Sequence, residues 1–100
     1  MSDDTPVATS AVLMSASRHI AKSCGAENRA FLECKRADEN PEKCLQQGQQ
    51  VTGCVLTLLK SLHGQCPKSM DAYVKCMDYY SSEFSMCRKQ QERFLADCPL

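Results

Sequence analysis

The chain has 100 residues, with 12 basic and 12 acidic side chains and a formal net charge of zero. This length suits one compact domain or two small modules in tandem, and no stretch concentrates Lys or Arg enough to follow a phosphate backbone or an anionic bilayer, so we expect no nucleic-acid partner. Eight of its hydrophobic residues are cysteines and only three Tyr and three Phe are aromatic. The apolar core should therefore be thin, and a covalent staple is expected.

Residues 1–23 are predicted to form a flexible N-terminal arm. Two acids, Asp3 and Asp4, precede any basic residue, and the apolar run at 11–14 is far shorter than a signal-peptide core. The segment 10–22 has modest helical character but no cysteine to hold it, so we expect it to order only on a partner. The sequence therefore predicts no cleaved leader.

The eight cysteines recur at nearly constant steps of 10, 10, 10, 12, 10, 11 and 11 residues. A step of 10 or 11 is close to three helical turns, about 15 Å, so two cysteines of one helix share a face. The cysteines are Cys24, Cys34, Cys44, Cys54, Cys66, Cys76, Cys87 and Cys98. The pattern predicts an all-α fold of two tandem disulfide-stapled antiparallel helical hairpins.

The first hairpin is predicted over residues 24–63. Its first helix should span about 26–37, just after Gly25. Asn40-Pro41-Glu42 offers an N-cap, a proline at the first helical position and an early acid, so the second helix should begin there. His63-Gly64 is expected to end it, because glycine interrupts helices.

The second hairpin is predicted over residues 64–100. Pro67 suits the first turn of a third helix, and Ser81-Ser82 should break the chain before a fourth. No window supplies the roughly 20 apolar residues of a membrane helix, because Lys60 interrupts the longest apolar run. A peripheral protein without a transmembrane helix is therefore expected.

Antiparallel helices with matched cysteine offsets favour nested disulfides. The first cysteine of one helix then faces the last of its partner, and both bridges reach a Cα separation of roughly 4.4 to 6.8 Å together. Eight cysteines permit 105 connectivities, and spacing alone leaves the other 104 open. The favoured pairs are Cys24-Cys54, Cys34-Cys44, Cys66-Cys98 and Cys76-Cys87.

Metal binding and catalysis find little support. Zinc and iron-sulfur sites use close pairs such as C-x2-C, whereas no two cysteines here are closer than ten residues. The same spacing lacks the C-x-x-C of thiol-disulfide catalysts. His19 and His63 have no acidic or nucleophilic companion at a recognisable spacing, so both are predicted to be surface or helix-end residues. We expect no enzyme activity, cofactor or metal.

The second helix is more apolar than one hairpin partner requires. Packing between the two hairpins would explain this, and so would a docking surface for a larger protein. Its apolar residues are Val51, Val55, Leu56, Leu58, Leu59 and Leu62.

Paired C-x9-C helices resemble the coiled-coil-helix-coiled-coil-helix proteins of the mitochondrial intermembrane space, and the resemblance covers residues 24–98. The flanks SAVLMSASRHIAKSC, ENPEKCLQQGQQVTGC, CMDYY and CRKQQERF are similar to those of an accessory-subunit family of respiratory complex I. One departure is the last helix, from Cys87 to Cys98, which has ten intervening residues where the family has nine.

The resemblance implies a non-catalytic structural accessory subunit that supports assembly and stability of complex I. It would be imported without a presequence, oxidised by the intermembrane-space disulfide relay, and held beside other membrane-arm subunits on the intermembrane-space side of the inner membrane. Phe31, Tyr73 and Phe84 each stand three residues before a cysteine, and match the pattern by which the relay oxidase transiently docks its substrates.

Two other interpretations remain. A free assembly factor or metallochaperone of the same compartment would have the same cysteine pattern. A secreted disulfide miniprotein would also need four bridges, although the expected secretory signal is missing.

Overall fold

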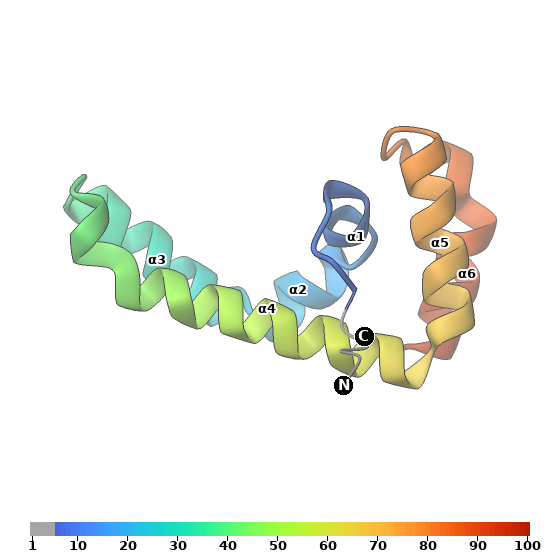
Figure 1. Ribbon diagram of the computed structural model, residues 1–100, viewed down its shortest axis with the longest axis horizontal. Coiled ribbons are helices and arrows are strands. Elements are labelled where there is room, and N and C mark those ends of the chain that lie inside the picture. The colour runs from blue at the N-terminus through green and yellow to red at the C-terminus, as the bar shows by residue number, and fades with distance from the viewer. Residues whose placement is uncertain (1–5) are drawn as a thin grey trace.

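The computed structural model describes residues 6–100, and all regular secondary structure in that range is helical. This confirms the predicted all-α fold of two disulfide-stapled hairpins. Figure 1 shows the hairpins diverging from a corner between α4 and α5. The elements are α1 (Ser10–Ser15), α2 (Ser17–Ser23), α3 (Gly25–Ala37), η1 (Pro41–Cys44), α4 (Leu45–Gln65), α5 (Pro67–Tyr79), η2 (Phe84–Cys87) and α6 (Arg88–Asp97).

The first hairpin pairs α3 with α4 through a tight turn. At the turn, the Asn40 side chain accepts a hydrogen bond from the Glu42 N–H at 3.1 Å, and Pro41 occupies the first helical position. An Asn cap followed by proline is a strong helix start, because proline lacks the N–H that would otherwise be unpaired. None of the residues of α3 is buried. The first hairpin therefore has little apolar core of its own.

Helix α4 continues beyond its predicted end and joins the two hairpins as one rod of 21 residues. Gly64 lies inside the helix, where it costs only about 1 kcal/mol relative to alanine. Burial of Leu59 and Leu62 in this part of the helix offsets that cost. The helix ends at Gln65 because Pro67 disfavours a helical conformation at Cys66, which has φ −140° and ψ 59°.

The second hairpin pairs α5 with α6. Ser81 and Ser82 form the break between them, and both adopt the left-handed conformation, with φ 55° and 64°. This confirms the chain break that was expected at the two serines. The apolar core of the molecule lies mainly in this hairpin, where Met70, Tyr73 and Phe94 are at most 2% exposed.

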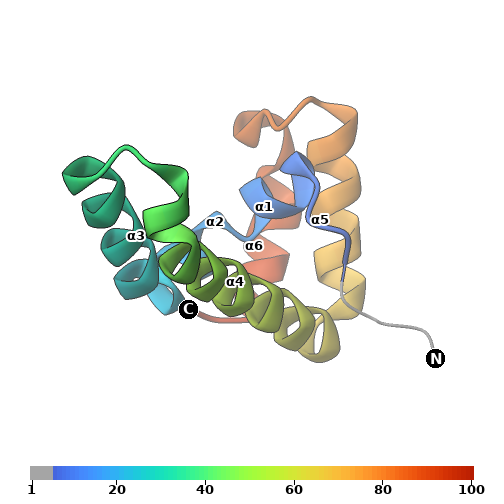
Figure 2. The same cartoon turned by 60° about the vertical axis from the view of Figure 1, so that its left-hand side comes forward.

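The N-terminal segment differs from the expected flexible arm. Helix α1 folds against α5, as Figure 2 shows, while α2 lies against α4 and packs His19 on Phe94 of α6. Ala11, Val12 and Ala16 are buried in the same core as Met70 and Tyr73. Their small side chains let the short helix approach closely, so packing replaces the missing cysteine as its anchor. The part of the predicted arm at residues 1–5 lies outside the described residues.

Because the two hairpins bury different amounts of apolar surface, shortening a side chain should destabilise the second hairpin more than the first. Replacing buried Phe94 by alanine should lower the free energy of unfolding by about 3 to 5 kcal/mol, because a large cavity opens in the packed core of the second hairpin. Leu56→Ala is the matched control, since Leu56 is 42% exposed and a surface truncation should cost under about 0.5 kcal/mol. Thermal unfolding of the oxidised variants measures both, and equal losses would contradict this distribution of the core.

Candidate functional site

Four disulfides join facing helices in nested pairs and use all eight cysteines. Their Cα separations of 5.9 to 6.1 Å are within the ordinary range for disulfides. Two close the first hairpin and two close the second. The bridges are Cys24–Cys54, Cys34–Cys44, Cys66–Cys98 and Cys76–Cys87.

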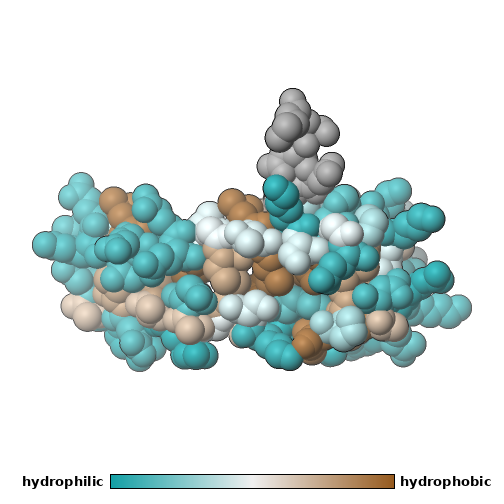
Figure 3. Space-filling model, turned by 90° about the horizontal axis from the view of Figure 1, so that it is seen from below, coloured by the Kyte–Doolittle hydropathy of each residue, from teal (hydrophilic) through white to brown (hydrophobic). Residues whose placement is uncertain are grey.

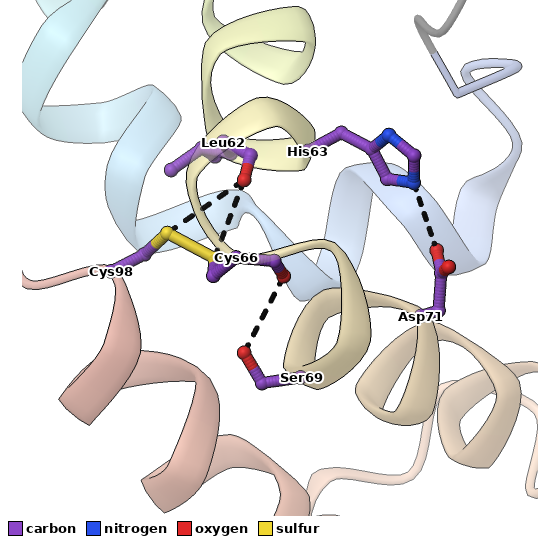
Figure 4. Close-up of polar contacts among 6 residues, drawn as sticks. All are labelled: Leu62, His63, Cys66, Ser69, Asp71 and Cys98. Atoms are coloured by element: carbon purple, nitrogen blue, oxygen red, sulfur yellow. Dashed lines mark hydrogen bonds and ion pairs between the residues drawn. A yellow bond between two sulfur atoms is a disulfide. The ribbon is translucent and has the colours of Figure 1, made fainter.

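The Cys66–Cys98 bridge lies at the corner between the hairpins and is the best covered of the four. Cys66 is 5% exposed and Cys98 is 1% exposed, whereas each other bridge has one partly exposed cysteine. Figure 4 shows the Leu62 carbonyl oxygen beside both sulfurs, at 3.3 and 3.7 Å. Bridged sulfurs carry no proton, so these are close contacts and not hydrogen bonds. The Ser69 hydroxyl donates to the Cys66 carbonyl at 3.4 Å.

His19 is buried, which overturns its predicted surface position. It is 4% exposed, and its Nε2–H donates to the Cys98 carbonyl oxygen at 2.7 Å. Its ring packs on Phe94 with centroids 5.0 Å apart. Nearby, the Lys22 ammonium donates to the Leu100 carbonyl oxygen. These contacts tie α2 to the C-terminal end, over a sequence distance that local spacing could not reveal.

His63 also has a companion that the sequence analysis missed. Its Nε2 lies 3.2 Å from Asp71 Oδ1, across the corner between α4 and α5 (Figure 4). A separation of eight residues is not a helical contact, so the pair exists only because the chain turns at Cys66. Both side chains are partly exposed, at 25% and 58%, which suits a corner contact.

The described residues offer no thiolate for a metal. In that part of the chain, the group with suitably close ligand atoms is Cys24, Glu27 and Cys54. The two sulfurs are bonded to each other, so neither is a thiolate that could ligate an ion. A lone carboxylate does not make a metal site.

The three aromatic residues matched to oxidase recognition lie apart in the folded chain. Tyr73 is 2% exposed within the core, while Phe31 and Phe84 are partly exposed on different hairpins. The Lys35 ammonium lies over the Phe31 ring, 5.3 Å from its centroid. The fold does not gather them into one site. If they mediate recognition, they do so one at a time, and Tyr73 does so only before folding.

The apolar residues of α4 divide between two surroundings. Leu59 and Leu62 are buried in the core, whereas Val51 and Leu56 line an open groove of about 840 Å³ on the first hairpin. Hydrophobic atoms reach the surface in patches between hydrophilic side chains (Figure 3). The groove was not predicted from the sequence, because its lining includes Gly48 and Gly53, which carry no side chain to mark it. We call the surface lined by residues of α3, η1 and α4 the first-hairpin groove.

No family model matches this chain. Individual relatives do. The chain is 60% identical over 95 residues to NADH dehydrogenase (ubiquinone) 1 alpha subcomplex subunit 8-A of Arabidopsis thaliana, covering 95% of this chain and 88% of that protein. Subunit 8-B of the same plant is 58% identical, over 95% of this chain and 90% of its own length. The NADH-ubiquinone oxidoreductase 20.8 kDa subunit of Neurospora crassa is 32% identical over 81% of this chain and 45% of that protein.

Burial predicts the order in which the bridges are reduced. Under limiting reductant, Cys66–Cys98 should open last, because both of its sulfurs are shielded from an attacking thiolate. Alkylation at timed intervals followed by peptide mass spectrometry gives the order. The same experiment in denaturant is the control, and the protection of Cys66–Cys98 should disappear there. Early opening of this bridge in the folded protein would contradict its buried position.

Tyr73 should make stability fall at high pH. Burial raises the pKa of the Tyr73 phenol above its ordinary value of 10.0, although a hydrogen bond with Gln91 and the charges of Arg18 and Arg88 partly oppose this. The unfolded phenol therefore loses its proton first. The contribution of Tyr73 to the free energy of unfolding is complete below about pH 10, and it is lost as the pH rises through the pKa of Tyr73 in the folded chain. Denaturant unfolding of Tyr73→Phe beside the parent should show a shallower decline over this interval, and identical slopes would contradict the assignment.

Proposed function

Because this chain belongs to the NADH dehydrogenase (ubiquinone) 1 alpha subcomplex subunit 8 family, we propose that it is a non-catalytic structural accessory subunit of respiratory complex I. Its role is to support assembly and stability of the complex. Identity of 60% along 95% of the chain is the observation that carries this proposal. The relatives do not favour a free assembly factor or metallochaperone.

The geometry supports a mechanical role. Loops of 10 and 30 residues are closed in the first hairpin, and loops of 11 and 32 in the second. Each bridge of this size can stabilise the fold by about 2 to 4 kcal/mol by restricting the unfolded chain. A helix pair held in this way changes little on docking, so it loses little conformational entropy.

The proposed location is the inner mitochondrial membrane, at the intermembrane-space side. Four disulfides require an oxidising compartment, which supports that side over the matrix. Within residues 6–100, no helix combines the length and apolar character needed to cross a bilayer. The proposed partners are other membrane-arm subunits, with the disulfide relay oxidase as a transient one.

Recognition by the oxidase would act on the reduced, unfolded chain. Tyr73 is 2% exposed after folding and could not serve as a docking side chain in the native protein. In the reduced chain, Phe31, Tyr73 and Phe84 are all available three residues before Cys34, Cys76 and Cys87. The aromatic residues would therefore have two successive roles, the first in oxidation and the second in packing.

Native electrophoresis tests the proposed function. A tagged copy of the chain, expressed in place of the native protein, should comigrate with assembled complex I after mild detergent extraction of mitochondria. A tag that becomes accessible to protease once the outer membrane is ruptured would support the intermembrane-space side. The double variant Cys66→Ser with Cys98→Ser is the control for folding and should fail to accumulate. Recovery of the parent chain only as a small free species would contradict the proposed function.

A further inference from the structure

The two hairpins share one cysteine register, so their residues can be compared position by position. Counting from Cys34 and Cys76, and from Cys44 and Cys87, places equivalent side chains on equivalent faces. The same aromatic or apolar floor then recurs in both hairpins. The equivalent pairs are Phe31 with Tyr73, Gly48 with Gln91, Val51 with Phe94, and Thr52 with Leu95.

In the second hairpin this floor is covered by the N-terminal segment. Ser15, Ser17 and Arg18 lie over it, and the space left there is about 10 Å³. As a result, Tyr73 is 2% exposed and Phe94 is fully buried. Ser15 at the end of α1 is small enough for a close approach, and the His19 ring of α2 packs on Phe94, so two short helices are a sufficient cover.

In the first hairpin the equivalent floor is open. Phe31, Gly48, Val51 and Thr52 line the first-hairpin groove of about 840 Å³, and no segment within residues 6–100 occupies it. Lys35 stands at the position of buried Met77, and it lies over the Phe31 ring. A lysine stem can cover apolar surface while its ammonium stays in water. The Lys35 side chain can therefore shield the Phe31 ring before docking and remain hydrated at the edge of the groove after it.

We propose that the first-hairpin groove is the docking site for a short helix of a different polypeptide. This helix presents small side chains such as Ala and Ser to Phe31 and Gly48, in the way that α1 and the residue after it present Ala11, Ser15 and Ala16 to the second hairpin. That the partner is another subunit of the same complex rests on the proposed function. A second copy of this chain is a poor occupant, because its own α1 is already packed on its own second hairpin.

The charges at the groove indicate the orientation of the partner helix. Asp38 and Glu39 line the end of the groove at the hairpin tip, and neither forms an ion pair within residues 6–100. The cation of the lining, Lys35, is already placed over Phe31. A partner helix with an Arg or Lys toward the tip would therefore complement the groove.

Two glycines of α4 support a close approach. An added Cβ at Gly48 would lie 3.3 Å from the Phe31 ring, so this position has to be small to seat the aromatic floor. At Gly53 nothing lies within 4 Å of an added Cβ. A glycine inside a helix costs about 1 kcal/mol, and within residues 6–100 no packing at Gly53 offsets it. A partner backbone lying against this helix would require the small residue.

Filling the groove tests the proposal. Gly53→Leu adds a side chain at the groove, where an added Cβ meets no atom within 4 Å, and Gly64→Leu is the matched control, open in the same way at its Cβ on the same helix but outside the groove. Leucine favours helix over glycine, so both variants should form four disulfides and melt at or above the parent temperature. Comigration with complex I should fall at least about tenfold for Gly53→Leu, equivalent to 1.4 kcal/mol, and stay unchanged for Gly64→Leu. Unchanged comigration of Gly53→Leu would overturn the proposal.

A photo-cross-linking residue at Thr52, used in intact mitochondria, separates this inference from the proposed function. Mapped by mass spectrometry, the adduct should lie on a helical segment of another polypeptide with small residues three or four positions apart. Such an adduct supports docking of a helix in the first-hairpin groove even if the chain does not comigrate with complex I. An adduct to lipid, to a second copy of this chain, or to no protein would refute the groove as a docking site while leaving comigration, and the proposed function, intact.

Discussion

The fold depends on cysteines placed three helical turns apart, so that two bridges can join the same pair of helices. A single bridge would leave two short helices free to pivot. Two bridges, separated along the axis, fix both the distance between the helices and their register. This constraint matters most in the first hairpin, where no residue of α3 is buried and where the hydrophobic effect alone could not hold the pair. The two helices stay antiparallel and in register because the bridges join them at two separate points.

The two hairpins divide the tasks of the molecule between them. The second combines its bridges with a packed core and a cover supplied by α1 and α2. The first has the same bridges without the cover, so it keeps an apolar floor exposed in a rigid frame. Helix α4 belongs to both, burying Leu59 and Leu62 in the core and presenting Val51 and Leu56 to the groove. A rigid rod anchored at one end can hold a docking face in place at the other.

Local features of the sequence were enough to predict the helices and the nested arrangement that the structure contains. The caps at Asn40 and the break at Ser81 act over a few residues, and cysteine spacing reports helix geometry directly. The missed features all depend on contacts across the fold. Gly64 does not end α4, since burial nearby outweighs its low propensity. His19 is buried against Phe94 and bonds a carbonyl 79 residues away, and the N-terminal segment packs on Met70 and Tyr73. The groove was missed because glycine forms part of its floor.

Disulfides allow the first hairpin to keep an apolar surface exposed until a partner binds. An apolar surface on a marginally stable helix pair would tend to collapse or rearrange, burying itself by changing the fold. Covalent closure removes that route, because the helices cannot slide or separate to cover Phe31 and Val51. The exposed floor then persists until another chain supplies what α1 supplies in the second hairpin. Oxidation thus fixes the shape first and leaves the binding surface to be completed by a partner, so that folding and docking are separate steps.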